Sequence, residues 1–275
     1  MKPLYLLAFI TAALAGPPPA SAQDTTYFDS RRNPVDPLHA DFFETKVQTD
    51  SGSTFADHWM NGKLKITGTF AADMKTRVGT FAYYDSTGSL RKRIRFTGKD
   101  SCPETDYYPG GQVMMEGNIN QVMMKGYSYF EKDGDWTAYY PTGKLKAKAS
   151  FKDGQQAAAS FYNEDGSTNN AMNVFYQEAD YPGGSQAWLR FLNKTLRYPD
   201  EAVNHNQQGT VVIHFKVSKD GKTSDFSVVQ SASASLDKEA LRVIKASGDW
   251  QPAIYGGTPT DTYKSQPLVF KLESQ

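Results

Sequence analysis

The feature that most constrains the fold of this chain is a short aromatic motif followed by a glycine turn, which recurs between residues 51 and 172. The pattern Tyr-Tyr-x-x-x-Gly-x-Leu is clear at 83–90 and close to complete at 139–145, and a weaker copy occupies 107–113. Strand-like pieces rich in aromatic and β-branched residues alternate with turn dipeptides at spacings of roughly 10–12 residues. This rhythm predicts a meander of antiparallel hairpins. Because one hairpin has too little apolar surface to be stable alone, neighbouring hairpins must pack together, and most aromatic residues are expected to be packing residues.

The composition excludes several classes of protein. The 275 residues are 39% hydrophobic, with 16 Tyr, 16 Phe and 4 Trp, so a folded core is expected. Thirty Lys and Arg balance thirty Asp and Glu. Nucleic-acid binding needs concentrated positive charge, so no nucleic-acid partner is expected. The one cysteine, Cys102, excludes a disulfide framework within the chain. We interpret it as an unmodified thiol in a loop, with a disulfide to a partner as the alternative.

The first residues are typical of an export signal. Lys2 precedes an apolar run at 4–15, and Ala20-Ser21-Ala22 has the small-x-small pattern that signal peptidase reads. A membrane-spanning helix needs about 20 apolar residues, whereas this run ends at Gly16. The sequence therefore predicts a signal peptide over 1–22, cleaved before Gln23, and an exported protein. An uncleaved membrane anchor is the alternative.

The pattern changes again after Tyr181-Pro182-Gly183-Gly184. Apolar residues recur at helical spacing over 185–196 with Ser185 as the expected N-cap, and a second helix is expected after Ser235. Residues 209–217 alternate as a strand, a return strand follows around 226–228, and a last strand is expected at 268–272. The order helix, strand, strand, helix, strand predicts a small α+β domain with a three-stranded antiparallel sheet and two helices.

An ordered set of residues over 180–275 resembles the TonB C-terminal domain family. The resemblance implies structural roles for Tyr198, Pro199, Gly209, Asp220, Gly221, Trp250 and Pro252. The segment from Tyr181 to Leu192 resembles the extension of Bacteroidota-type members, and the Tyr-Tyr-x-x-x-Gly-x-Leu pieces resemble MORN-type repeats. The predicted organisation is a signal peptide (1–22), an extended lead-in without periodicity (23–50), a MORN-like β-repeat domain (51–172) and a TonB C-terminal-like domain (180–275).

The resemblance carries an expectation about function. Members of the family lie in the periplasm, take part in transmembrane transport and bind a short segment of outer-membrane transporters, the TonB box, as an added strand. An exposed edge strand suits this role because it has unpaired backbone donors and acceptors. The resemblance implies that the receiving edge consists of Leu268, Val269, Phe270, Lys271 and Leu272. The partner is expected to be such a transporter or another envelope protein segment, and the same edge could instead pair two copies in a homodimer.

Two alternatives stay open because the chain departs from the family pattern. An energy-transducing member keeps an uncleaved anchor, usually with a polar His or Ser, followed by a Pro-rich spacer. Here the apolar run contains no His, β-repeats replace the spacer, and Glu201 stands where many transducers carry a basic residue. The chain is then either a divergent transducer that retains its N-terminal segment as an anchor, or a secreted scaffold that binds no peptide.

No constellation of residues indicates catalysis. The histidines, His39, His58, His205 and His214, form no metal-binding pair, and neither a nucleophile elbow nor a phosphate loop occurs. We therefore predict that the chain is not an enzyme and has no catalytic residues, no metal and no small-molecule cofactor. The basic cluster of Arg91, Lys92, Arg93 and Arg95 is interpreted as the solvated face of one strand. A surface for an anionic cell-wall polymer is the alternative.

Overall fold

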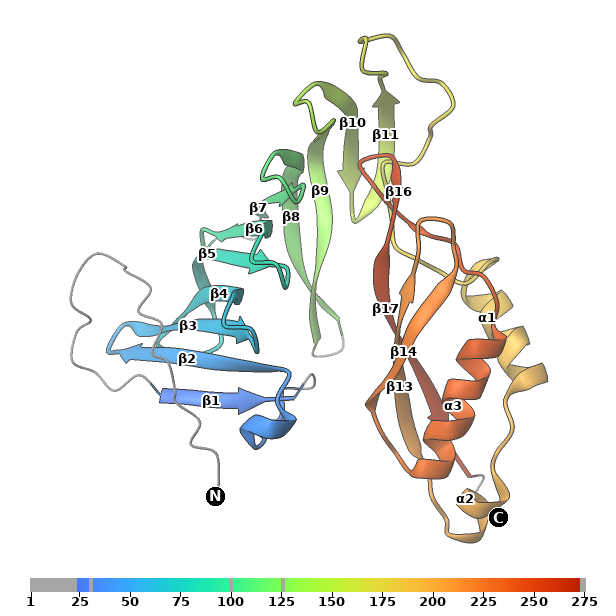
Figure 1. The fold of residues 1–275 in the computed structure, drawn as a ribbon. Helices are drawn as coiled ribbons and strands as arrows, with labels where there is room; N and C mark the ends of the chain where they lie inside the picture. Colours follow the sequence, from blue (N-terminus) through green and yellow to red (C-terminus); the bar gives the residue numbers. More distant parts are fainter. Residues whose placement is uncertain (1–23, 30–31, 99–100, 125–126, 273–275) are drawn as a thin grey trace, which may run out of the picture.

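The computed structural model describes residues 24–29, 32–98, 101–124 and 127–272 (Figure 1). The predicted signal peptide and its cleavage point lie outside these residues. An eleven-stranded antiparallel sheet in strict chain order, here called the large sheet, is followed by a three-stranded sheet with the order β14-β13-β17, here called the small sheet. Figure 1 shows helices α1 and α3 beside the small sheet. The predicted fold class, a β-meander followed by a small α+β unit, is confirmed.

The strands of the large sheet follow one another with short connections. They are β1 (Asp24–Phe28), β2 (Phe42–Thr49), β3 (Gly52–Trp59), β4 (Leu64–Ala71), β5 (Arg77–Tyr84), β6 (Leu90–Phe96), β7 (Ser101–Tyr107), β8 (Val113–Met124), β9 (Tyr127–Tyr139), β10 (Leu145–Lys152) and β11 (Gln155–Phe161). A short 3-10 helix, η1 (Pro37–His39), lies between β1 and β2.

The interpretation of residues 23–50 as an extended lead-in needs correction. Strands β1 and β2 are the first two strands of the large sheet, and β2 pairs with β3 from Phe42↔Trp59 to Thr49↔Gly52. The periodic pattern is weak because most side chains of β2 are half-buried rather than alternately buried and exposed. An alternation of apolar and polar residues is strong only where one face of a strand is buried and the other is solvated.

The recurring glycine motif is one type of hairpin turn. The N–H of Asp85 donates to the carbonyl of Ser89 at 3.0 Å, and the N–H of Gly88 donates to the carbonyl of Asp85 at 2.9 Å. The same two bonds close the turns at 59–63, 108–112, 140–144 and 163–167. Gly88 has φ +85°, a left-handed conformation that glycine adopts without steric cost. The motif therefore specifies how alternate pairs of strands are joined.

Aromatic rings fill the core of the large sheet by covering glycines on neighbouring strands. A Cβ on Gly68 would lie 2.5 Å from the Phe81 ring, and a Cβ on Gly117 would lie 2.4 Å from the Trp136 ring. The indole N–H of Trp136 donates to the carbonyl of Asn118 at 2.9 Å. The same core contains Cys102, which lies in β7 and not in a loop. Its side chain is buried, so the thiol is not accessible to a second chain.

The C-terminal part contains the remaining elements. They are α1 (Gly184–Thr195), α2 (Asp200–Asn204), β13 (Gly209–Val217), β14 (Thr223–Gln230), α3 (Ala234–Ala246) and β17 (Thr262–Phe270), with the short strands β12 (Tyr176–Gln177), β15 (Ala253–Tyr255) and β16 (Thr258–Thr260). The predicted helix caps are wrong by about two residues. Gly183 precedes α1 without a side-chain cap, and the Ser233 hydroxyl accepts from the N–H of Leu236 at the start of α3.

The small sheet has a core on its helix-covered face. Alternate residues of β13 are fully buried, as the sequence predicts: Val211, Ile213, Phe215 and Val217. They belong to one apolar cluster with residues of α3 and with Trp188 of α1. Burial of each such side chain stabilises the fold by about 1.5–3 kcal/mol. Both helices are therefore held by apolar packing on one face of the sheet.

A third sheet, with the order β12-β15-β16, joins the two parts of the molecule. Tyr176 of β12 stacks on Tyr255 of β15 with ring centroids 5.3 Å apart. A Cβ on Gly256 would lie 2.7 Å from Ala138, and a Cβ on Gly257 would lie 2.8 Å from the Phe161 ring. Residues 255–257 thus form the tip of the β15–β16 hairpin, which packs closely against the end of the large sheet. The hairpin fixes the small sheet beside the large one.

The turn at Gly221 gives a stability prediction. Gly221 has φ +83°, a Cβ there would lie 2.4 Å from the carbonyl oxygen of Trp250, and the N–H of Trp250 donates to the carbonyl of Gly221 at 2.8 Å. Gly221→Ala is expected to lower the free energy of unfolding by about 2–4 kcal/mol, because the left-handed conformation and the contact with the backbone both oppose a methyl group. Urea unfolding measures the change. Gly143→Ala is the matched control, since Gly143 has φ +80° but no neighbour within 4 Å. Equal losses in the two variants would contradict this explanation.

Candidate peptide-binding edge

Strand β17 forms one edge of the small sheet. It spans Thr262–Phe270, whereas the sequence predicts a strand at 268–272. The observed strand therefore starts six residues earlier and ends two residues earlier than the predicted one. Lys271 and Leu272 follow the strand and are not part of the edge ladder. The first half was missed because its sequence is polar and contains Pro267, and a proline in a strand-like run usually argues against a strand. Prolines are nevertheless accepted at sheet edges, where the missing N–H faces solvent.

Two observations show which backbone groups of β17 face away from the sheet. Pro267 pairs with Val212 and has no N–H to donate to β13, which places its nitrogen on the open side. The N–H of Ser218, just after β13, donates to the carbonyl of Lys222 on the β14 side. Even-numbered residues of β13 therefore face β14, and odd-numbered residues face β17. In the observed register the odd residues pair with even-numbered residues of β17, so Tyr263, Ser265, Pro267 and Val269 face outward.

The outward groups form a short, interrupted ladder. In the described ranges no other strand pairs with this edge. Tyr263, Ser265 and Val269 each present one N–H and one carbonyl, whereas Pro267 presents a carbonyl alone. The side-chain amide of Gln266 lies 3.5 Å from that carbonyl, a weak contact. A visiting strand can therefore accept hydrogen bonds from the outward N–H groups of Tyr263 and Ser265. Beyond the proline, Val269 offers one further N–H group.

The side chains of β17 divide cleanly between the two faces of the sheet. Leu268 and Phe270 are buried in the core, while Tyr263 and Val269 are each 56% exposed. His214 of β13 stacks on Tyr263 with ring centroids 5.1 Å apart, and its Nδ1 lies 2.9 Å from the Ser265 hydroxyl. Partial burial lowers the pKa of His214, which favours the neutral ring. Of the five residues that the resemblance assigns to the edge, only Val269 directs its backbone groups outward within the strand.

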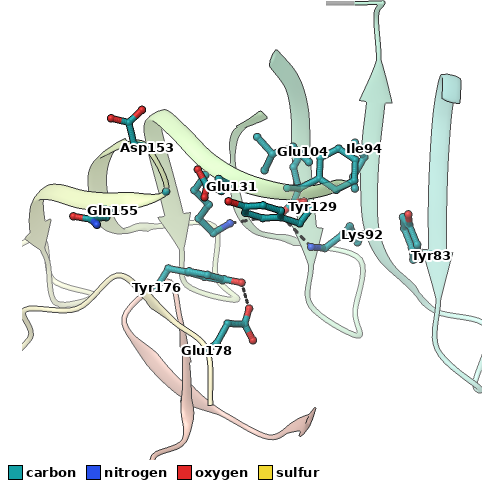
Figure 2. A pocket seen from close by; sticks show the side chains of 14 residues that line it. Tyr83, Lys92, Ile94, Glu104, Tyr129, Glu131, Asp153, Gln155, Tyr176 and Glu178 are labelled. Carbon is teal, nitrogen blue, oxygen red and sulfur yellow. Dashed lines mark hydrogen bonds and ion pairs between the residues drawn. The ribbon is translucent and has the colours of Figure 1, made fainter. Parts of the chain in front are cut away.

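A second candidate site is a pocket of about 640 Å³ on the large sheet, beside strand β12 (Figure 2). Its inner wall carries the buried Glu104 and Lys132 and the partly exposed Lys92. Lys92 Nζ lies 3.1 Å from Glu104 Oε1 and 3.4 Å from Asp106 Oδ1, and Lys132 Nζ lies 3.5 Å from Glu104 Oε1. Lys92 therefore belongs to the inner face of β6. The interpretation of the basic cluster as one solvated face is wrong for this residue, although Arg93 and Arg95 are exposed.

Burial controls the protonation of this cluster. It raises the pKa of Asp106 to about 6 and lowers the pKa of Lys132 to about 8. Burial also opposes the charge of Lys92, but the carboxylates of Asp106 and Glu104 raise its pKa above the usual value. Lys132 is held between two aromatic rings, 3.2 Å from the centroid of Trp136 and 4.4 Å from that of Tyr176. The arrangement is a fixed set of paired charges in an apolar setting.

Two tyrosine–glutamate pairs line the outer part of the pocket. The Tyr176 hydroxyl donates to Glu178, and the neighbouring carboxylate of Glu131 raises the pKa of the Tyr129 hydroxyl. Figure 2 shows Tyr129 and Glu131 on one side and Tyr176 and Glu178 on the other. The sequence holds a possible signal, Tyr-x-Glu at both positions. The pocket could not be predicted from it, because its residues come from 83 to 178 and only the strand order brings them together.

The residues of the family motif stabilise the C-terminal part and do not line the β17 edge. The Tyr198 hydroxyl donates to the carbonyl of Gln207 at 2.5 Å, and Pro199 precedes α2. The buried Trp250 donates from its indole N–H to the Ser247 hydroxyl at 2.9 Å. The other motif residues lie at the start of β13 (Gly209), in the turn after β13 (Asp220, Gly221) and before β15 (Pro252).

The described residues contain neither a metal site nor a membrane helix. In the ranges given above, no group of three or more His, Cys, Asp or Glu side chains is placed to hold a metal ion. Likewise, none of the helices in the described part of the chain combines the length and the apolar character needed to cross a membrane.

Comparisons with known proteins agree with the fold. Residues 194–272 match the model of the Gram-negative bacterial TonB protein C-terminal family, and residues 132–153 match the model of the MORN repeat variant. The resemblance of both parts of the chain is thus confirmed. Comparison with curated protein sequences gives no match.

Two solved structures are also similar to this chain, and both are solution structures of the C-terminal domain of Helicobacter pylori TonB. For the longer segment the identity is 23% and the TM-score 0.27, over 34% of this chain and 89% of that one. For the shorter segment the identity is 21% and the TM-score 0.26, over 33% of this chain and 95% of that one.

Proposed function

We propose that this protein is exported to the periplasm and captures an extended peptide by adding it as a strand to β17. The observation that supports the proposal is the row of outward backbone groups on Tyr263, Ser265, Pro267 and Val269, which no described strand covers. A segment of an outer-membrane transporter, such as a TonB box, is the partner that the family match favours, which would link the protein to transmembrane transport. The protein acts through binding and not through catalysis.

The proposed division of labour follows the predicted domains. Residues 180–275 provide the receiving edge, and the β-repeats of 51–172 act as a scaffold or a second contact surface. Transduction of energy would further require that the N-terminal segment stays attached as an anchor. Detection of Gln23 as the N-terminus of the mature protein by mass spectrometry would exclude the transducer alternative.

The proposal can be tested by titrating the full mature chain with fluorescent synthetic peptides copied from the TonB-box segments of outer-membrane transporters. Saturable binding in the micromolar range is expected, because each edge hydrogen bond contributes only about 0.5–1.5 kcal/mol. The bound state should protect the amides of Tyr263 and Ser265 from exchange. Binding without such protection, or no binding by any of the peptides, would contradict strand addition. A dimer in the absence of peptide that protects the same amides would instead assign the edge to a second copy of the chain.

A further inference from the structure

The pocket of Figure 2 lies next to the first residues of β17. Lys264 Nζ donates to the carbonyl of Ala179 at 2.8 Å, and Ala179 directly follows the pocket residue Glu178. Tyr255, whose ring stacks on Tyr176 of the pocket, pairs with Thr258 of β16, the strand that ends two residues before β17 begins at Thr262. A strand that pairs with Tyr263 and continues past this end of β17 therefore meets the pocket.

The carboxylates that line the pocket outnumber its lysines, and the excess lies in the outer part of the pocket. Its lining includes two lysines, Lys92 and Lys132, and four carboxylates, Glu104, Glu131, Asp153 and Glu178. Both lysines are already engaged with Glu104, and Lys92 also contacts Asp106. Among the described residues, no Lys or Arg lies within ion-pair distance of Glu131, Asp153 or Glu178. The unmatched charge of the outer pocket is negative.

Glu131 and Glu178 retain acceptor capacity for a guest. Glu178 accepts from the Tyr176 hydroxyl, and a carboxylate has about four lone-pair sites, so further donors can bind to either glutamate. The ring of Tyr129 is 36% exposed and can contact a cation through its face. The inner face of Tyr176 is already occupied by Lys132 and its other face by Tyr255. The accessible groups are therefore these two carboxylates, with Asp153 as a third, and one aromatic ring, which suit an ammonium or guanidinium group.

We infer that this pocket receives a lysine or arginine side chain of the peptide bound to β17, at the peptide end that lies beside Tyr263. The inference rests on the proposed strand addition and extends it by naming the class of peptide. The β17 edge supplies backbone hydrogen bonds that are indifferent to sequence, and the pocket of the large sheet supplies selection for a basic residue. Both parts of the chain then contribute to one binding surface.

The test uses three synthetic peptides with the same alternating threonine–valine core. One is neutral, one carries two lysines at its amino end and one carries them at its carboxyl end. On the full mature chain, one of the lysine peptides is expected to bind about tenfold more tightly than the neutral peptide, because a charge-assisted hydrogen bond is worth at least one factor of ten. Which lysine peptide is preferred reports the direction of the added strand. Raising the salt concentration should reduce the preference.

Matched variants separate this inference from the proposed function. The double variant Glu131→Gln and Glu178→Gln keeps an acceptor for the Tyr176 hydroxyl, so it should bind the neutral peptide as before and lose the preference for lysine. Glu116→Gln is the control, because Glu116 accepts from the Tyr139 hydroxyl at 2.9 Å outside the pocket. If all three peptides protect the β17 amides and bind equally, or if the double variant keeps the preference, the inference is overturned and strand addition stands. If no peptide protects these amides, both are overturned.

Discussion

Ser265→Pro is expected to reduce the affinity for a captured peptide at least tenfold while leaving the fold in place. The N–H of Ser265 faces outward, so proline there removes no backbone hydrogen bond to β13 and loses only the contact of the Ser265 hydroxyl with the His214 side chain. It does remove the central donor of the exposed ladder and places a ring where a visiting strand would lie. Together with Pro267 it would leave Tyr263 and Val269 as the outward donors of β17. The free energy of unfolding should change by no more than about 1 kcal/mol.

Gln266→Pro is the matched comparison for this prediction. Gln266 pairs with Ile213 and its N–H faces β13, so proline at this position breaks the ladder inside the sheet. A loss of about 3 kcal/mol in the free energy of unfolding is expected. Fluorescence titration with a labelled TonB-box peptide and urea unfolding, carried out on both variants, separate binding from stability. Unchanged peptide binding by a folded Ser265→Pro variant would show that capture does not use this edge.

Glu104→Leu is expected to lower the free energy of unfolding by about 3–5 kcal/mol at pH 7, because it removes the ion-pair partner of the buried Lys132. Lys92 keeps its contact with Asp106, so the effect should centre on Lys132. The double variant Glu104→Leu and Lys132→Met should recover most of the loss, since methionine fills the space without a charge. A single loss below about 1 kcal/mol, or no recovery in the double variant, would contradict a tightly coupled cluster.

The sign of the pH dependence of this variant follows from the lowered pKa of Lys132. The folded state disfavours the charged ammonium, so the pKa is lowered from 10.5 to about 8 in the native protein. A group with a depressed pKa binds more protons in the unfolded chain, and the stability linked to it rises with pH between these two values. Glu104 raises the pKa of Lys132, so the Glu104→Leu variant releases this proton at a lower pH than the wild type does. The deficit of Glu104→Leu should therefore shrink as the pH rises from 7 through the wild-type pKa of about 8 to 9, as measured by urea unfolding at pH 7 and pH 9.

The parts of the fold that could be predicted are those in which the sequence pattern is strong. Strand β13 alternates because Val211, Ile213, Phe215 and Val217 are fully buried on one face and the other face is solvated. The glycine turns of the meander are visible because a left-handed residue is needed in the same place each time, as at Gly88 and Gly143. Local chemistry and burial agree in these segments, which is why the α+β class and the meander could be derived.

The remainder depends on contacts that no local pattern encodes. The hairpin of β15 and β16 is short, and its tip at Gly256 and Gly257 is shaped by Ala138 and Phe161, more than ninety residues away in the chain. The first half of β17 has a polar sequence because its side chains, from Thr262 to Gln266, are half-buried or exposed. The buried side chains of this strand, Leu268 and Phe270, lie in its second half. The sequence indicated a solvated basic strand around Lys92. The carboxylates that pair with Lys92 lie on the next strand, so no local pattern shows that this lysine faces inward.

Amide hydrogen exchange of β17 in the free, full-length protein tests the open edge most directly. The structure predicts an alternation along the strand. Tyr263, Ser265 and Val269, whose N–H groups face outward, should exchange quickly, and Lys264, Gln266, Leu268 and Phe270, whose N–H groups face β13, should exchange slowly. Slow exchange at all of these positions would mean that the outward N–H groups already have a partner, and the edge would then be unable to receive a peptide.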